Sequence, residues 1–445
     1  MTGSGPESER APATPTALIL GEPALEGPGG GHPAGLTPIL GRSPLQRHLF
    51  HLARLGVPRC VVVPSLRPAP GLAEEARRQA ADLSLGRMSV RVADAPETVS
   101  PPFGGPADVL LIRAEGVYDA RLYRELVRAR GPVCLVDGEG SGDGSEPGEV
   151  RPIGLCRVPA GELSRDLAEI RAAHFGAPSP AETTDCPQRS LSEMPSYLPD
   201  LRRHLRPYWC VPRSAADRKR AARLILDAAQ KGVLDFPARF LHPLPENFCV
   251  RRLAGTGITP NQVTLATAAL AFLGTFLFAT GSFGPALLLA AAVNVLDGVD
   301  GKLARVKLLS SRFGDRLDHV LDVTFEFSWY LGLGWGLSQA SGDPVSFRLG
   351  ALLIGVMIGA RAVSGIYRSL TGRQIHDHRA FDRAFRLVAG RRNVYVVLLV
   401  AGFVVGRLET AFRAAFWWGV ATLAVYVGRT LVAATGSKRP EPSER

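Results

Sequence analysis

Five aspartates lie within one short stretch of the chain, DGVDGKLARVKLLSSRFGDRLDHVLD (297–322), between two apolar runs. Asp297 and Asp300 are three residues apart and share one helix face, whereas Asp318 and Asp322 are four apart and share a face of the next helix. Two antiparallel helices would bring these four carboxylates together. Because four such charges repel strongly unless cations lie between them, the spacing predicts a metal site.

The ligand types narrow the choice of metal and of chemistry. Oxygen ligands without Cys or His favour Mg²⁺, Mn²⁺ or Ca²⁺ over zinc, and two such ions suit displacement at a phosphorus centre. Arg305 lies on the first of the two helices and could bind a diphosphate with its forked guanidinium. Gly301 and Ala304 carry little side-chain bulk beside the acids, which leaves room for a flat base or a diphosphate.

Six apolar segments follow residue 258, each near the ~20 residues that a membrane-spanning helix needs. They are 262–280, 284–304, 314–337, 347–368, 393–408 and 411–434, and the aspartates lie on the second and third. Lys and Arg are dense in 302–316 and 368–392, which marks these loops as cytoplasmic. We therefore expect an all-α, six-helix transmembrane domain in the cytoplasmic (inner) membrane, with the N-terminal half in the cytoplasm.

The composition agrees with a membrane protein in a reducing compartment. Hydrophobic residues make up 46% of the chain, and the net charge is +11. The arginines gather near the ends of apolar segments, which fits anionic lipid better than nucleic acid. The first residues are polar, so we expect no cleavable signal peptide. The six cysteines form no CxxC pair, which argues against a zinc site and against a disulfide framework.

The first half of the chain alternates strands with helices between residues 17 and 175, which predicts an α/β doubly wound sheet. Strands are expected at 17–20, 60–64, 88–93, 109–114 and 133–136, with helices at 44–56, 72–83 and 119–130. Pro, Ser and Thr predict a linker at 176–198. Arg and aromatic residues at 199–258 predict juxtamembrane amphipathic helices, or alternatively an ordinary soluble helix pair. Residues 1–16 and 436–445 are expected to be disordered.

The acidic stretch resembles the signature of the CDP-alcohol phosphotransferase (phosphatidyltransferase) family. The matching positions are Asp297, Asp300, Gly301, Ala304, Arg305, Gly314, Asp318 and Asp322. The resemblance covers 256–435, and we expect the domain at 259–435. It implies transfer of a phosphoalcohol from a CDP-linked donor to a hydroxyl, with release of CMP. It also implies two divalent metals, Mg²⁺ or Mn²⁺, on the four aspartates, with Asp322 as the base.

The same resemblance implies the donor side of the site. Gly301, Ala304 and Arg305 would contact the CDP group. The segment TPNQVT (259–264), which opens the first span, resembles the nucleotide side of the family's site and adds Asn261 and Thr264. The donor remains open between CDP-inositol and CDP-diacylglycerol, and homodimers are common in the family.

Arginines within or beside the later spans suggest the acceptor side. Arg361, Arg391, Arg392 and Arg429 are costly at membrane depth unless they line a cavity or reach the interface. Converging guanidinium groups suit an acceptor that carries a phosphate. A different class of protein also remains possible from the sequence: a membrane transporter or scaffold that has an acidic ion site.

The N-terminal half resembles the start of sugar-phosphate nucleotidyltransferases, as in bifunctional inositol-phosphate cytidylyltransferase/phosphotransferases. The shared layout is a strand, a Gly-rich loop, a helix and a strand within residues 17–65. Two positions depart from that family. Thr37 stands where a Lys precedes the later Pro, and Glu115 stands where a metal-binding Asp is expected. We therefore expect a degenerate domain for docking or regulation, with a second active enzyme as the alternative.

Overall fold

The computed structural model describes residues 15–21, 34–66, 71–94, 108–138, 150–161, 167–175 and 186–436. The Gly-rich loop at 22–33, much of the predicted linker and nearly all of the predicted disordered ends fall outside these ranges. Contacts divide the chain into two compact units. The first comprises 1–197 and 204–228, and the second comprises 198–203 and 229–445. Each unit is described by itself.

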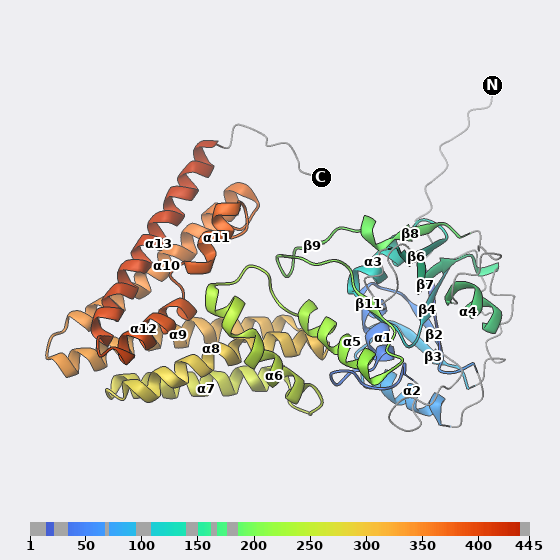
Figure 1. Cartoon of the computed structure of the whole chain (residues 1–445), viewed down its shortest axis with the longest axis horizontal. Helices are drawn as coiled ribbons and strands as arrows, with labels where there is room; N and C mark the ends of the chain where they lie inside the picture. The colour runs from blue at the N-terminus through green and yellow to red at the C-terminus, as the bar shows by residue number, and fades with distance from the viewer. Residues whose placement is uncertain are drawn as a thin grey trace. The chain divides into compact units, whose positions relative to one another are not determined.

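The first unit is built on a seven-stranded sheet in the order β3-β2-β1-β4-β7-β6-β8 (Figure 1). The strands are β1 (Thr16–Leu20), β2 (Arg59–Val63), β3 (Ser89–Val92), β4 (Val109–Arg113), β6 (Val133–Asp137), β7 (Arg151–Val158) and β8 (Gln188–Ser190). Neighbours are parallel except at β7, which is antiparallel to both β4 and β6. The predicted α/β sheet is thus confirmed, with one reversed strand.

Helices cover both faces of this sheet. They are α1 (Pro44–Arg54), α2 (Leu72–Ala81), α3 (Ala120–Arg128) and α4 (Leu167–Phe175). Later in the chain, α5 (Ala215–Ala228) contacts β11. Alternate residues of β1 enter different hydrophobic clusters, Ala17 and Ile19 in one and Leu18 and Leu20 in the other. Both faces are therefore buried, as expected for a sheet in an α/β unit. A short ladder joins β5 (Val117–Tyr118) to β11 (Trp209–Cys210), and β9 (Tyr197–Leu198) pairs with β10 (Arg203–His204).

Three expectations for this half need correction. The predicted linker at 176–198 is partly folded, because β8 pairs with β6 and is followed by a 3-10 turn, η3 (Leu191–Glu193). Strand β7 was not predicted, since Arg, Pro and Gly interrupt its apolar pattern. Helix α5 groups with the first unit, so the segment 199–258 is not a single set of juxtamembrane helices.

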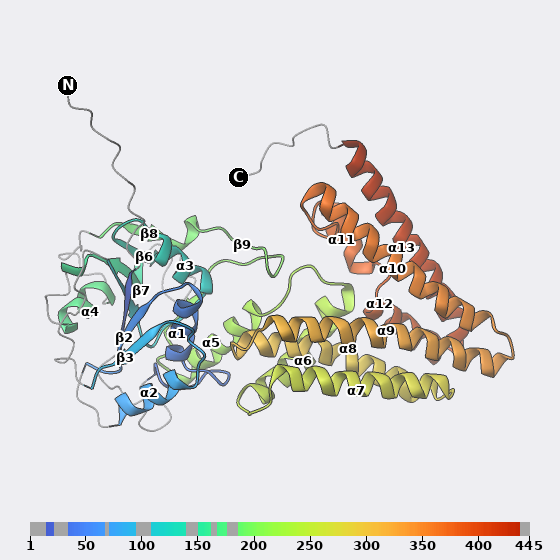
Figure 2. The ribbon, with the colours of Figure 1, turned by 180° about the vertical axis from the view of Figure 1, so that it is seen from behind.

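The second unit is helical. Its elements are η4 (Pro237–Leu241), α6 (Pro243–Ala254), α7 (Pro260–Ala279), α8 (Phe283–Val306), α9 (Arg312–Ser341), α10 (Val345–Thr371), α11 (Ala380–Val388), α12 (Arg392–Val404) and α13 (Leu408–Gly436). Seen from behind in Figure 2, α7, α8 and α9 run side by side, and α7 packs closely against both α8 and α9. A capping box between Thr259 and Gln262 starts α7.

Five of the six expected spans are long and apolar enough to cross a membrane among the described residues. They are α7, α8, α10, the pair α11 and α12 taken together, and α13. The exception is α9, which carries four acids in its first half. It packs closely instead: Trp329 donates to the Ala271 carbonyl of α7 at 2.7 Å, and Gly332 and Gly336 lie against the α7 backbone.

The region before α7 exposes apolar side chains. Phe236, Phe240, Leu241, Leu244 and Phe248 are each at least half exposed. Arg239 lies over the Phe240 ring and Arg252 over the Phe248 ring. Aromatic groups next to arginines are typical of a helix that lies at a membrane surface.

Candidate active site in the helical unit

Three of the predicted metal-binding aspartates lie together. Asp297 on α8 and Asp318 and Asp322 on α9 each offer a carboxylate oxygen, and these oxygens lie within 4.8 Å of one another. The helical spacing places Asp318 and Asp322 one turn apart on α9, facing Asp297 across the helix pair. All three are partly buried. An all-oxygen group of this kind suits a hard divalent cation.

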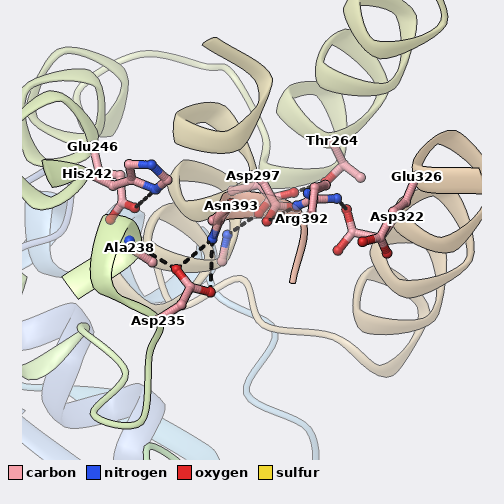
Figure 3. Close-up of polar contacts among 12 residues, drawn as sticks. Asp235, Ala238, His242, Glu246, Thr264, Asp297, Asp322, Glu326, Arg392 and Asn393 are labelled. Atoms are coloured by element: carbon pink, nitrogen blue, oxygen red, sulfur yellow. Dashed lines mark hydrogen bonds and ion pairs between the residues drawn. The ribbon is translucent and has the colours of Figure 1, made fainter. Parts of the chain in front are cut away.

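Arg392, at the start of α12, joins this group. It donates to Asp297 Oδ2 at 2.7 Å and to Asp322 Oδ1 at 3.0 Å (Figure 3). Its guanidinium also lies 4.8 Å from the centre of the Phe325 ring. We expected Arg392 among the acceptor-binding residues. The structure places it on the acidic cluster itself, where one positive charge offsets part of the repulsion among the carboxylates.

Asp300, the fourth predicted ligand, lies apart from the other three. It accepts hydrogen bonds of 2.5 Å from Thr264 Oγ1 of α7 and from the Gly301 backbone N–H. Its side chain is almost fully buried. Thr264, expected on the donor side, therefore contacts the acidic motif directly.

The remaining donor-side residues lie around the ends of α7, α8 and α9. Arg305 donates to the Ala229 carbonyl at 2.8 Å. A methyl group added at Gly301 would meet the Arg305 guanidinium at 3.5 Å, an ordinary contact, so protein packing alone does not require glycine there. Asn261 lies beside Gly314, where an added methyl group would approach its Oδ1 to 2.9 Å. Ala304 is partly buried on α8.

A buried ion pair, which the sequence analysis did not predict, connects α8 to α6. Lys302 contacts Glu246 of α6 at 2.7 Å and donates to Asn247 at 3.0 Å. Gly298 lies so close that a side chain there would clash with the Glu246 carboxylate. Lys302 follows Gly301 inside the quoted motif, which was an available signal, whereas nothing in the sequence singled out Glu246.

A second missed contact holds the start of α12. Asn393 donates to Asp235 Oδ1 at 3.0 Å and to Oδ2 at 3.2 Å (Figure 3). Asp235 also accepts from the Ala238 backbone N–H at 3.2 Å and thereby caps η4. Since Asn393 is next to Arg392, this contact helps to orient the arginine on the acidic cluster.

The other predicted acceptor-binding arginines have different surroundings. Arg361 pairs with Glu326 at 2.9 Å, and Arg391 and Arg392 also lie within electrostatic range of that acid. Arg429 instead forms a two-bond pair with Asp382 of α11, at 2.7 and 2.8 Å. Arg361, Arg391 and Arg392 thus lie near one acid, Glu326, whereas Arg429 has another partner, and their part in acceptor binding stays a prediction.

A further basic group lies near Arg391. Arg386 of α11 is buried, and its Nε and Nη1 have no hydrogen-bond partner among the described residues. Burial, together with the positive charges of Arg386, Arg391 and Arg202, lowers the pKa of His376 to about 2. The arginines thus add to the effect of burial in disfavouring a further positive charge here, and a group of guanidinium charges attracts anions.

In the first unit, the two positions that depart from the nucleotidyltransferase pattern, Glu115 and Thr37, have no free charge to offer a substrate phosphate or metal. The Glu115 side chain is 2% exposed and lies between Arg113, at 3.5 Å, and Arg171, at 3.6 Å. Thr37 is partly buried and carries no positive charge. The Glu115 carboxylate is therefore already neutralised by protein cations.

Comparison with known proteins gives a family match for the helical unit. Residues 257–436 match the family model described as CDP-alcohol phosphatidyltransferase. A "Bifunctional IPC transferase and DIPP synthase" of Aquifex aeolicus is 28% identical over 208 residues, 46% of this chain and 46% of the relative. A protein of the same name from Thermococcus kodakarensis is 26% identical over 410 residues, 87% of this chain and 90% of the relative. The matched part thus spans about half of the first relative and nine tenths of the second.

A solved structure is similar to the helical half at a low level. The crystal structure of Mycobacterium tuberculosis phosphatidylinositol phosphate synthase (PgsA1) with CDP-DAG bound has 17% sequence identity and a TM-score of 0.35. It covers 46% of this chain and 100% of that chain. Similarity at this level assigns no substrate.

Proposed function

We propose that this protein is a membrane enzyme that transfers a phosphoalcohol from a CDP-alcohol to an acceptor hydroxyl and releases CMP. Residues 257–436 match the family model described as CDP-alcohol phosphatidyltransferase. Among the described residues, the unit that contains them has five helices that are long and apolar enough to cross a membrane. The observation that carries the proposal is the group of three carboxylates, Asp297, Asp318 and Asp322, on facing helices. The product would be a phospholipid or an inositol-phosphate compound.

In the proposed reaction, the acceptor oxygen attacks the phosphorus that is bonded to the donor alcohol. A new O–P bond forms, the bond from that phosphorus to the oxygen of CMP breaks, and CMP leaves with the electron pair. Asp322 takes the proton of the attacking hydroxyl. Its carboxylate lies beside Asp297 and Asp318, so base and phosphate would be held in one place.

The carboxylate group also suits a resident divalent cation, either Mg²⁺ or Mn²⁺. Asp297, Asp318 and Asp322 would bind it, and Asp300 would join a second ion after a change at its bond to Thr264. When bound, such ions neutralise charge on the phosphate oxygens. Without them, Arg392 is the single positive partner hydrogen-bonded to this group among the described residues.

The donor would lie along the ends of α7 and α8. Gly301 and Ala304 would leave space for the CDP group, Arg305 would contact its diphosphate, and Asn261 and Thr264 would close the nucleotide side. Support comes from Gly301, since its position beside the Arg305 guanidinium has no packing reason to be glycine.

For the acceptor, we propose an anionic compound, bound through its phosphate by the arginines near α12. Arg391, Arg361 and Arg392 were proposed from the sequence, and Arg386 is added because its buried guanidinium nitrogens lack partners among the described residues. Arg429 already forms two hydrogen bonds with Asp382, which leave fewer of its N–H groups for an acceptor.

The donor alcohol is proposed to be inositol, with diacylglycerol as the competing choice. The full-length similarity to a protein named as a bifunctional transferase and synthase supports the first choice. The N-terminal domain (17–175) is proposed to be non-catalytic, because arginines already neutralise Glu115. A homodimer in the cytoplasmic membrane, with this domain in the cytoplasm, completes the proposal.

The test is an assay of the purified full chain in lipid nanodiscs with Mg²⁺ or Mn²⁺. CDP-inositol and CDP-diacylglycerol are each offered with inositol phosphate, glycerol phosphate or inositol, and CMP and the product mass are measured. Metal-dependent CMP release with one donor is expected. Absence of CMP release from every pair would overturn the proposal and favour a transporter or scaffold.

A separate assay addresses the N-terminal domain. The full chain is given CTP with inositol phosphate or a sugar phosphate, and pyrophosphate is measured. We expect none above background. Pyrophosphate release that survives Asp318→Asn in the helical unit would make the protein bifunctional.

A further inference from the structure

Three metal-ligand side chains meet inside the first unit, and a fourth lies beside one of them, although all four are far apart in the sequence. Cys134 Sγ, Cys156 Sγ and a ring nitrogen of His174 lie within 4.8 Å of one another. Cys186 Sγ lies 3.0 Å from Cys134 Sγ, and His174 Nδ1 lies 3.6 Å from the same sulfur. All four side chains are buried. We propose that these three cysteines and the histidine bind one zinc ion.

The two distances from Cys134 Sγ are close to those of a tetrahedral zinc site, and Cys186 Sγ would also have to move towards Cys156 and His174. Zinc binds thiolate sulfur at about 2.3 Å and imidazole nitrogen at about 2.0 Å, which separates two sulfurs by ~3.8 Å and a sulfur from a nitrogen by ~3.5 Å. The Cys134–His174 distance already has this value. The Cys134–Cys186 pair needs to open by less than 1 Å, which small side-chain rotations provide. Three Cys and one His are a usual ligand set for structural zinc.

The backbone brings these residues together from four separate elements. Cys134 on β6 and Cys156 on β7 are direct partners in the antiparallel ladder. His174 is on α4, which packs over β7. Cys186 precedes β8, and the Cys134 N–H donates to the Pro187 carbonyl at 2.8 Å, so it is held beside β6. The absence of a CxxC pair in the sequence said nothing about this arrangement, because no two of these ligands are close neighbours in the chain.

A zinc ion at this position would stabilise the edge of the sheet. Strand β8 has three residues and ends the sheet, and α4 has nine. Short peripheral elements bury little apolar surface and open easily. A zinc ion would join both to the central strands β6 and β7. The site is structural, because the four protein ligands complete a tetrahedral shell and leave no position for a substrate.

The test begins with the zinc content of the full chain, expressed with added zinc and purified without chelator. About one zinc per chain is expected from the four-ligand set. In Cys156→Ala the content should fall about tenfold, because one of four ligands is lost and a neighbouring thiolate becomes exposed to exchange. The matched control is Cys210→Ala, a buried cysteine of the same unit outside the group, which should keep its zinc. Wild-type protein without zinc, or equal loss in both variants, overturns the proposal.

A second measurement does not depend on any variant. Wild-type protein that has been stripped of metal is titrated with Co²⁺, and the thiolate-to-cobalt charge-transfer absorption is recorded. This band reports sulfur ligands, so cobalt on the aspartate cluster of the helical unit does not contribute to it. A saturable band at one cobalt per chain supports the site. Absence of the band, or a Cys134–Cys186 disulfide found by mass spectrometry of the unreduced protein, contradicts it.

Discussion

Arg392 and Asp322 form a 3.0 Å ion pair that connects α12 to α9, and the second arm of the same guanidinium reaches Asp297 on α8. One arginine thereby holds together two helices whose carboxylates would otherwise repel each other. This is the position in which a divalent cation would also act, since both oxygens belong to the candidate metal group. The arginine and the cation therefore share their ligands.

Replacing this arginine should make stability depend on metal. Arg392→Met keeps most of the packing over Phe325 and removes the charge. In metal-free buffer we expect the thermal midpoint to fall, because removing one partner leaves buried charges uncompensated, a loss of about 3 kcal/mol. Added Mn²⁺ should raise the midpoint more than in the wild type.

The matched control for that variant is Arg413→Met, which breaks an exposed pair with Glu409. Its midpoint should change little, since exposed pairs contribute about 0–1 kcal/mol. An equal Mn²⁺ response in Arg392→Met and in the wild type would mean that the arginine and the metal do not share ligands.

Removing one carboxylate from the cluster should abolish turnover. Asp318→Asn keeps the shape of the side chain and removes its charge, so metal binding and CMP release should fall by about a thousandfold or more. Asp315→Asn is the control, because Asp315 is exposed at the start of the same helix and lies outside the group. CMP release measured with saturating metal distinguishes the two, and normal turnover in Asp318→Asn would refute the assignment.

Two glycines on α8 should respond to alanine in opposite ways. At Gly298 the new methyl group meets Glu246 and disturbs its pair with Lys302, so we expect a loss of about 1–3 kcal/mol in unfolding free energy. At Gly301 the nearest atom is 3.5 Å away, so the fold should hold, whereas KM for the CDP-alcohol should rise about tenfold. Thermal unfolding and donor titrations check the pair. A destabilised Gly301→Ala with unchanged KM would remove that glycine from the donor site.

The first unit should lose stability in mild acid through His48. This fully buried ring contacts the Tyr123 hydroxyl at 2.6 Å and the Ala114 carbonyl at 3.1 Å. Burial lowers its pKa from 6.5 to about 4, so the unfolded chain takes up the proton first as the pH falls. The stabilisation is complete above pH 6.5 and is lost towards pH 4, up to about 3 kcal/mol.

Limited proteolysis of the full chain across that pH range measures the effect on the first unit. His48→Gln keeps polar atoms at this position and does not titrate. It should therefore make the pH dependence between pH 6.5 and 4 shallower, even if its overall stability is lower. The neighbouring His51, whose pKa burial lowers to about 3, keeps part of the slope. An unchanged slope would show that other groups cause the loss.

Local sequence spacing predicted that Asp297, Asp318 and Asp322 meet, although it also placed Asp300 in the same group, and it predicted five of the seven strands of the described sheet. Asp318 and Asp322 share a face because they are four residues apart on a helix, and the predicted strands of the first unit alternate clearly with helices. Arg392 could not be assigned to Asp297, 95 residues earlier, because only tertiary packing brings them together. The same limit applies to Asn393 with Asp235, and to the buried cysteines with His174.

Other differences arose where neighbouring elements override local preference. The acids of α9 lower its apolar character, yet close contacts of Gly332 and Gly336 with α7 place it inside the bundle. The sequence predicts a linker at β8, because its three residues are too few to show an apolar pattern. It forms a strand because it pairs with β6.

The buried pair between Lys302 and Glu246 has a mechanical consequence. It joins the acidic end of α8 to α6, whose neighbouring phenylalanines and leucines are exposed. If those side chains rest in the lipid headgroups, α6 sets how deep the carboxylates lie below the membrane surface. Lipid composition would then influence how easily the proposed substrates reach these carboxylates.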